Sequence, residues 1–228
     1  MILYLFDIDG TLLHAHGAGR EAFDAVLLEH HGLAGASEGV RYGGKTDGQI
    51  VDEIFQARLG RAATEAEHAA FIAAYLPKLR ANLKRHGVDI IEGVAYALAW
   101  LATRSDARMG VATGNVREGA AAKLAQCGLD AWFKGEHVGG YACDSRHRAE
   151  LVGAAIARGR ASTEVREVVV VGDTIHDVAA ARANGATVCA VATGTDTAEQ
   201  LASAGADAVW KSLRELPTWH AARYGELV

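Results

Sequence analysis

The sequence predicts an α/β fold, in which a doubly wound parallel sheet carries a small all-helical domain inserted after its first strand. Four short apolar runs predict buried strands, at residues 2–6, 109–112, 168–171 and 188–191. The runs are nearly continuous rather than alternating, which is typical of strands covered on both faces. Helical patterns separate them, and this alternation of strand and helix favours a doubly wound sheet.

Local signals predict the elements around these strands. Residues 208–210 are expected to add a strand at the edge of the sheet. Three helices are expected to begin at a polar residue that is followed three positions later by an acidic one, the pattern of a capping box. The pairs are Asn115 with Glu118, Thr174 with Asp177, and Asp196 with Glu199. In this architecture, ligands bind beyond the carboxyl ends of the strands.

One long segment, residues 14–91, interrupts the alternation. It contains no convincing strand, and apolar residues such as Ile72 and Leu76 recur in it at helical spacing. We therefore expect two parts, an α/β core made of residues 1–13 and 92–228 and a helical cap made of residues 14–91.

Composition excludes several classes of protein. The net charge of −5 argues against nucleic acid or an anionic membrane as the main partner. Three cysteines, odd in number and widely spaced, indicate neither a disulfide framework nor a zinc ribbon, so a reducing, cytoplasmic location is expected. We expect no signal peptide and no membrane span. Oligomeric state is not predicted.

Polar clusters directly follow three of the predicted strands. They comprise Asp7, Asp9 and Thr11 after the first strand, Thr113, Gly114 and Asn115 after the second, and Asp173, Thr174 and Asp177 after the third. Because parallel neighbouring strands end at the same edge of a sheet, we expect the clusters to meet there.

Four carboxyl groups would then lie close together. They belong to Asp7, Asp9, Asp173 and Asp177. Two unit charges 4 Å apart repel by about 4 kcal/mol at an effective dielectric near 20, so the group needs a cation or a shared proton. Carboxylate and carbonyl oxygens are hard ligands, which predicts Mg²⁺ as the cofactor.

The second cluster offers a complementary site for an anion. Thr113, Gly114 and Asn115 lie where a strand enters a helix, so free backbone N–H groups and the helix dipole favour a phosphate there. Arg146 and Arg148 precede another helical run and could add positive charge. These features together indicate phosphoryl transfer, in which one carboxylate attacks phosphorus and another moves the proton.

The ordered clusters resemble the motifs of the haloacid dehalogenase superfamily, specifically its phosphatases with a helical C1-type cap, of the phosphoglycolate phosphatase-like kind. The resemblance covers nearly the whole chain. It implies that Asp7 is the nucleophile, that Asp9 is the general acid and base, and that Thr113 binds phosphate. It also implies that Asp173 and Asp177 bind or orient Mg²⁺, together with Asp7 and the backbone carbonyl of Asp9.

The third motif of the family departs from the usual pattern. Relatives usually carry Lys there, often followed by Pro, whereas this chain offers Arg146 or Arg148. The spacing of Arg148 to Leu151 and Val152 favours Arg148, and the choice stays open at this point.

The resemblance leaves the substrate open beyond a small phosphorylated metabolite. It implies a Mg²⁺-dependent hydrolase of phosphate monoesters, with an aspartyl-phosphate intermediate. A phosphosugar mutase of the β-phosphoglucomutase type shares the same core motifs and is the alternative. Cap residues set specificity in this group, and the candidates for substrate contact are Lys45, Thr46 and Asp47.

One motif favours a different class of enzyme. Residues 39–46 fit GxxxxGK[ST], the phosphate-binding loop of nucleotide hydrolases. That loop works only between a buried strand and a helix. Residues 33–38 do not have the pattern of a strand, which disfavours this interpretation.

Overall fold

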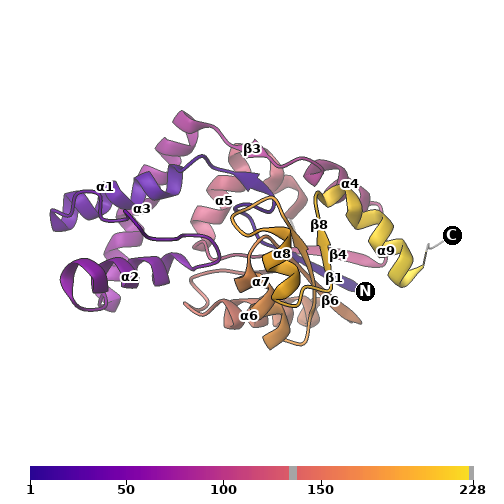
Figure 1. Cartoon of the computed structure of the whole chain (residues 1–228). Coiled ribbons are helices and arrows are strands. Elements are labelled where there is room, and N and C mark those ends of the chain that lie inside the picture. The colour runs from indigo at the N-terminus through magenta and orange to yellow at the C-terminus, as the bar shows by residue number, and fades with distance from the viewer. Residues whose placement is uncertain (134–137, 226–228) are drawn as a thin grey trace.

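The computed structural model describes residues 1–133 and 138–225 of the 228-residue chain, and Figure 1 shows its arrangement. A six-stranded sheet forms the centre of the core, and its strands pair in parallel in the order β5-β4-β1-β6-β7-β8. The strands are β1 (Ile2–Phe6), β4 (Ala107–Ala112), β5 (Gly139–Gly140), β6 (Glu167–Gly172), β7 (Thr187–Val191) and β8 (Ala208–Trp210). The prediction of a parallel α/β sheet is confirmed.

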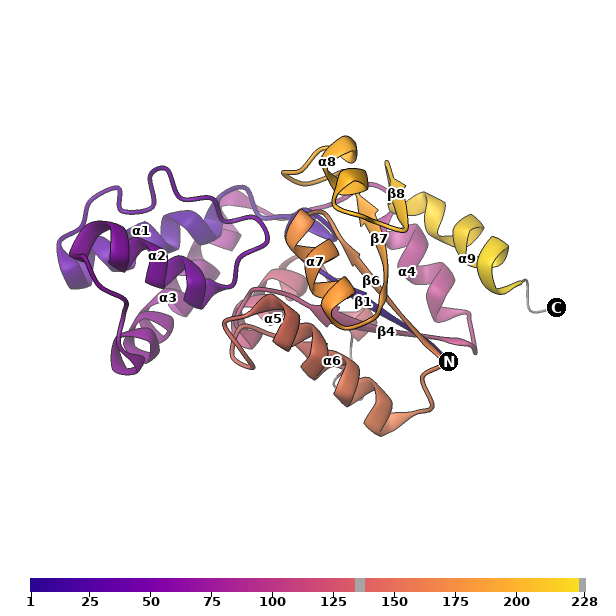
Figure 2. The ribbon, with the colours of Figure 1, turned by 60° about the horizontal axis from the view of Figure 1, so that its bottom comes forward.

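Helices cover both faces of the sheet, as Figure 2 shows. Alternate residues of β1 explain how: Leu3 and Leu5 pack on one side, and Tyr4 and Phe6 on the other. The first side is covered by α6 (Arg148–Ser162), α7 (Ile175–Ala183) and α8 (Ala198–Ser203). The second is covered by α4 (Val94–Ala102), α5 (Arg117–Gln126) and α9 (Leu216–Tyr224), with the short 3₁₀ helices η1 (Leu129–Phe133) and η2 (Leu213–Glu215).

The predicted strands are confirmed with small shifts in their ends. β1 and β8 have the predicted bounds, and β8 lies at the edge of the sheet, whereas β4, β6 and β7 are one or two residues longer than expected. β5 was not expected. It consists of two glycines, which carry no hydrophobic pattern, and it forms by parallel pairing with the end of β4.

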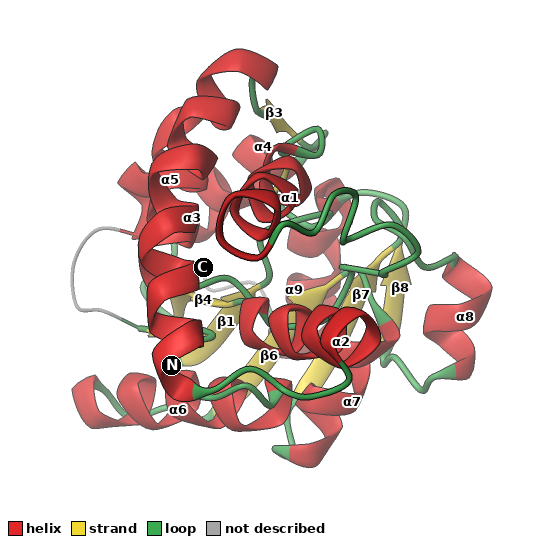
Figure 3. Ribbon diagram, turned by 90° about the vertical axis from the view of Figure 1, so that its left-hand side faces the viewer, coloured by secondary structure: helices red, strands yellow, loops and turns green. Residues whose placement is uncertain are grey.

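Residues between β1 and α4 form three helices, α1 (Ala18–His31), α2 (Asp47–Leu59) and α3 (Glu65–His86). Figure 3 looks at the molecule from their side and shows α2 lying in front of the ends of the strands. The sequence predicts no strand in this segment, but β2 (Leu13–His14) and β3 (Asp89–Ile90) pair antiparallel at its two ends. Two residues a strand are too few for a recognisable hydrophobic pattern.

Two of the predicted helix starts differ in outcome. The capping box of Thr174 and Asp177 is confirmed at the start of α7. At α8 the prediction is wrong by one residue, because Thr197 is the N-cap. Asp196 instead accepts a hydrogen bond from the Ile175 N–H at 2.8 Å, which ties the loop before α8 to the start of α7.

Within the described part of the chain, no helix is both long enough and apolar enough to cross a bilayer.

Candidate active site

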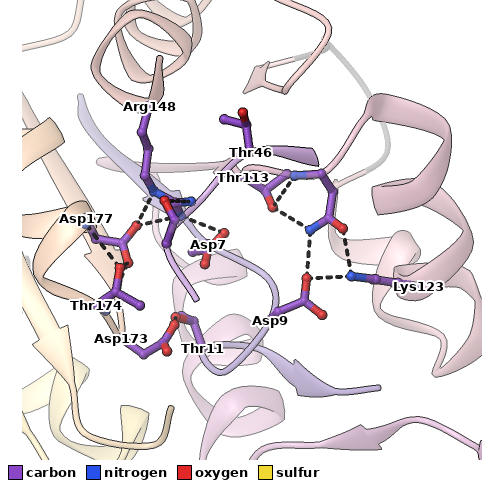
Figure 4. A network of polar contacts seen from close by, with 12 residues as sticks. Asp7, Asp9, Thr11, Thr46, Thr113, Lys123, Arg148, Asp173, Thr174 and Asp177 are labelled. Carbon is purple, nitrogen blue, oxygen red and sulfur yellow. Dashed lines mark hydrogen bonds and ion pairs between the residues drawn. The ribbon is translucent and has the colours of Figure 1, made fainter. Parts of the chain in front are cut away.

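Three neighbouring strands end at one place. Asp7, Thr113 and Asp173 follow the carboxyl ends of β1, β4 and β6, and β1 lies between the other two strands. β1 is paired in register with both of them as far as Phe6, so the chain leaves all three strands at the same level. Figure 4 shows the resulting group of polar side chains. The sequence-predicted meeting of the three clusters is therefore present in the structure.

Acidic side chains form one half of this group. One carboxylate oxygen from each of Asp7, Asp173 and Asp177 lies within 4.8 Å of the other two, and all three residues are buried. The Thr11 hydroxyl donates to Asp173 Oδ1 at 2.9 Å, while Asp173 Oδ2 has no hydrogen bond within the described residues. Hard oxygen donors gathered in this way fit Mg²⁺.

Two glycines make room for Asp173. A methyl group on Gly194 would overlap Asp173 Oδ2, and a methyl group on Gly10 would lie 2.5 Å from the same oxygen. Gly10 follows β1 and Gly194 follows β7, so backbone from two loops encloses this carboxylate. Gly194 is a residue that the sequence analysis missed.

The shared burial of these acids changes their protonation. Burial raises the pKa of Asp7 to about 6, against the opposing effect of Arg148, and the charges of Asp177 and Asp9 add to the rise. Burial, with the neighbouring charges of Asp177 and Asp7, raises the pKa of Asp173 to about 8. A divalent cation would oppose both shifts, since it favours the ionised form of each ligand.

Arg148 is the cation of this half of the site. Its Nη2 lies 2.9 Å from Asp7 Oδ1 and 2.6 Å from Asp177 Oδ1, and the side chain is buried. Burial opposes the charge of the guanidinium, but Asp177 and Asp7 raise the pKa of Arg148 even so. Arg148 Nε donates to Asp177 Oδ1, and the backbone N–H and hydroxyl of Thr174 donate to Asp177 Oδ2. Both oxygens of Asp177 therefore already accept hydrogen bonds.

Arg146, the other candidate for the third motif, lies elsewhere. Its guanidinium pairs with Glu65 at 2.5 Å and approaches Asp52 at 3.7 Å, and both acids belong to the helical segment after β1. Of the two arginines, the structure therefore brings Arg148 to Asp7 and uses Arg146 to bridge the core and the helical segment.

A second network forms the other half of the site. Asp9 Oδ2 accepts from Asn115 Nδ2 at 2.7 Å and from Lys123 Nζ at 2.6 Å. Lys123 also donates to Asn115 Oδ1 at 2.7 Å, and Asn115 Nδ2 donates to Thr113 Oγ1 at 2.8 Å. Burial alone would raise the pKa of Asp9, but the ammonium of Lys123 holds it below its ordinary value. The Asp9 carboxylate thus lies apart from the three grouped acids, and a metal-binding role for Asp9 rests on its backbone carbonyl.

These contacts correct the predicted start of α5 and add a residue. Asn115 does not cap α5, whose N-cap is Val116, because its side chain is engaged with Thr113 and Asp9. Lys123 was not predicted. It is the charged residue in a run of small and apolar residues at 119–125, and such a setting is the sequence signal that could have indicated a buried lysine.

The predicted substrate-contact residues lie in the loop before α2. Lys45 pairs with Glu53, and Thr46 caps α2 and donates its hydroxyl to the Arg146 carbonyl oxygen at 2.9 Å. Residues 32–46 lie in no helix or strand, so the strand that a nucleotide-hydrolase loop requires is absent from this described segment.

A cavity of about 560 Å³ lies between the strand ends and the helical segment. Its walls include Asp7, Asp9, Thr113 and Asp173 on one side, and Lys45 and Tyr42 on the other. Gly114, Asn115, Lys123 and Arg148 also line it. Carboxylates, cations and hydrogen-bond donors therefore face one space that a small molecule can enter.

Comparisons with known proteins agree with this geometry. Residues 4–191 match the model of the family described as haloacid dehalogenase-like hydrolase. The chain is 32% identical over 224 residues to a phosphoglycolate phosphatase from Rhodospirillum rubrum, covering 94% of this chain and 89% of that protein.

Solved structures support the fold alone. A hydrolase from Pseudomonas syringae aligns with a TM-score of 0.70 at 20% identity, covering 98% of this chain and 99% of that one. A protein named "Putative beta-phosphoglucomutase" from Bacteroides vulgatus aligns with a TM-score of 0.71 at 20% identity, and the alignment covers 99% of this chain and 90% of that one. The family model spans most of the sequence, and the motifs converge at the strand ends. The prediction of a phosphatase enzyme is confirmed at the level of the family that this model describes, and the chain belongs to the haloacid dehalogenase-like hydrolase family.

Proposed function

We propose that the protein is a Mg²⁺-dependent phosphatase that hydrolyses a small phosphate monoester through an aspartyl-phosphate intermediate on Asp7. The observation that carries the proposal is the position of the Asp7 carboxylate, which faces the same cavity as Thr113 and lies against Arg148 and Asp173. A nucleophile, an anion-binding turn and an acidic cation site are the parts that phosphoryl transfer needs.

Asp7, Asp173 and the backbone carbonyl of Asp9 are the proposed Mg²⁺ ligands, with Asp177 close behind them. The ion would offset the negative charge that gathers on phosphate oxygens during transfer. Asp177 has both oxygens in hydrogen bonds, so its proposed contribution is to hold Arg148 and add negative charge to the site.

The proposed reaction has two steps. An oxygen of Asp7 attacks phosphorus, the ester P–O bond breaks, and the departing alkoxide takes a proton from Asp9. Asp9 then takes a proton from water, whose oxygen attacks the phosphorus of aspartyl phosphate and releases inorganic phosphate and Asp7. Lys123 keeps Asp9 ionised in the absence of substrate. A phosphate dianion bound next to Asp9 would raise the pKa of this carboxyl, so that Asp9 takes up a proton from the solvent and can give it to the leaving group in the first step.

The residues proposed to hold the phosphate lie around Asp7. Thr113, Gly114 and Asn115 offer a hydroxyl, backbone N–H groups and an amide, and Arg148 holds the attacking carboxylate in place. Lys45, in the wall formed by the helical segment, is proposed to contact the leaving group. The similarity to a phosphoglycolate phosphatase makes phosphoglycolate the first substrate to test.

The test is the release of inorganic phosphate from phosphoglycolate, sugar phosphates and nucleoside monophosphates, with and without Mg²⁺. We expect turnover that needs Mg²⁺, and Asp7→Asn should lower it more than about a thousandfold because the amide is no nucleophile. Asp106→Asn is the control, since Asp106 precedes β4 at the opposite end of the sheet.

Two outcomes would contradict the proposal. Activity of Asp7→Asn close to that of the wild type would exclude Asp7 as the nucleophile. An isomeric sugar phosphate in place of inorganic phosphate would identify a mutase instead.

A further inference from the structure

The start of α2, in the helical segment, rests against the turn that joins β4 to α5 in the core. The Asp47 N–H donates to the Gly114 carbonyl oxygen at 2.7 Å, and Asp47 Oδ2 accepts from the Val116 N–H at 2.8 Å. Asp47 is buried at this contact. One residue of the helical segment therefore holds both ends of the turn 114–116, which contains two of the residues proposed to bind phosphate, Gly114 and Asn115.

α5 has no cap of its own. Its N-cap residue is Val116, whose side chain cannot accept a hydrogen bond. The first N–H groups of a helix have no partner inside the helix, and a carboxylate suits the positive end of the helix dipole. Asp47 supplies that carboxylate from 69 residues earlier in the chain. The amino-terminal end of α5 is thus completed by another part of the molecule.

Gly114 allows this close approach. A methyl group there would overlap the Lys45 carbonyl oxygen and lie 2.9 Å from the Lys45 carbonyl carbon and 3.0 Å from Thr46 Cα. Gly114 is not among the glycines with positive φ, so the need for glycine is steric rather than conformational. The contact joins backbone to backbone, and neither side can move aside as a flexible side chain could.

The turn is linked in the other direction to the proposed acid. Asn115, in the middle of the turn, donates to Thr113 Oγ1 and to Asp9 Oδ2. A displacement of the turn would therefore move the phosphate-binding hydroxyl and amide and would disturb the partners of Asp9.

We propose that Asp47 is a positioning residue, which fixes the turn 114–116, and through Asn115 the Thr113 hydroxyl, for phosphate binding only while the helical segment is docked on the core. The proposal rests on the proposed function, because the phosphate to be held is that of the substrate. Undocking α2 removes the acceptor of Val116 and the donor to Gly114 together. A docked helical segment and a formed phosphate site therefore occur together.

The experiment measures phosphate binding separately from turnover. Titration calorimetry with inorganic phosphate and Mg²⁺ gives a dissociation constant, and para-nitrophenyl phosphate gives kcat and KM. We expect Asp47→Ala to raise the phosphate dissociation constant and KM by about tenfold, as loss of a hydrogen bond to a charged group predicts. Asp47→Asn keeps an acceptor oxygen and should stay within about threefold of the wild type.

Two further variants separate positioning from general damage. Asp24→Ala is the matched control, because the Asp24 carboxylate also accepts from a backbone N–H, that of Ser37, but both residues lie within the helical segment. It should leave the phosphate dissociation constant and KM unchanged. Gly114→Ala disturbs the same contact from the core side, because its methyl group would overlap the Lys45 carbonyl oxygen. If the Asp47 N–H then loses the Gly114 acceptor, phosphate binding should weaken by about tenfold as well.

The outcomes decide the proposal even if turnover is absent. If the wild type binds phosphate but hydrolyses no ester, the proposed function fails, and the dissociation constants still decide the role of Asp47. If Asp47→Ala does not fold, retained binding in Asp47→Asn with weakened binding in Gly114→Ala supports the proposal. Equal phosphate binding by wild type, Asp47→Ala and Gly114→Ala would overturn the proposal. It would also be overturned if Asp24→Ala weakened phosphate binding as much as Asp47→Ala does, or if the wild type bound no phosphate.

Discussion

Ionisation of Asp47 opposes the folded state of the protein. Burial raises the pKa of this carboxyl from 3.8 to about 6, although Lys123 and the Val116 N–H oppose the rise. A carboxyl group whose pKa is higher in the folded than in the unfolded state binds its proton more tightly when folded. Its contribution to stability is therefore fully present below about pH 4 and is lost as the pH rises through 6.

The loss of stability as Asp47 ionises leads to a prediction for Asp47→Asn. The amide is neutral at every pH, so the variant avoids the cost of a buried charge, which is roughly 3 kcal/mol for a shift of this size. We expect the free energy of unfolding of the variant to exceed that of the wild type at pH 7.5, and the two to become equal near pH 4. Urea unfolding at several pH values measures the difference.

Asp106 provides a control, because its carboxyl group should change the stability with pH in the opposite direction. Its hydrogen bonds with Arg104 lower the pKa of Asp106, so Asp106→Asn should lose stability at neutral pH and not in acid. A difference between Asp47→Asn and the wild type that does not change between pH 4 and pH 7.5 would contradict the account of Asp47.

At the scale of the elements, strands with a continuous apolar pattern could be predicted from the sequence. The valines of β6 are buried on both faces of the sheet, and their run of four is a local signal of that environment. β5, with two glycines, has no such signal. The polar clusters could be predicted because they directly follow strands, and the order of the strands then brings them together.

The missing parts of the site depend on contacts between distant residues. Lys123 meets Asp9 across 114 positions of the chain, and Asp47 meets Val116 across 69. No periodic pattern encodes such a pairing, since it arises only after α2 and α5 have been placed. The choice between Arg146 and Arg148 was open for the same reason. Arg146 lies just before α6 and Arg148 is its first residue, and only the fold determines which guanidinium turns to Asp7.

The loop after β7 gives a prediction at this scale. Gly194→Ala would push a methyl group into Asp173 Oδ2, the oxygen left free for a cation. We expect the variant to need about tenfold more Mg²⁺ for half-maximal activity, as Asp173→Asn should, because the proposed ligand is displaced. A magnesium titration of phosphatase activity measures this.

Gly119→Ala is the matched control for Gly194→Ala. Gly119 lies in α5, and the nearest atom to a methyl group there would be Val116 Cγ2 at 3.4 Å, an ordinary packing distance. It should leave the magnesium requirement unchanged. If Gly194→Ala had the magnesium requirement of the wild type, Asp173 would not be the ligand that this loop positions.

At the scale of the whole molecule, the helices α1, α2 and α3 lie over the carboxyl ends of the strands. We propose that the two parts meet at residues 13/14 and 91/92, next to the short pairing of β2 with β3. The cavity lies between the parts, and Arg146, Thr46 and Asp47 connect them. Opening at this contact would admit substrate, and closing would exclude bulk water from the carboxylates.

Transfer of phosphate to Asp7 is the central claim, and trapping the intermediate tests it most directly. Wild-type protein is mixed with substrate and Mg²⁺, quenched in acid and reduced with borohydride, which converts an aspartyl phosphate to homoserine. Peptide mass spectrometry should then find homoserine at position 7, and Asp7→Asn should give none. Homoserine at another aspartate, or full turnover with no modified residue at position 7, would contradict the account.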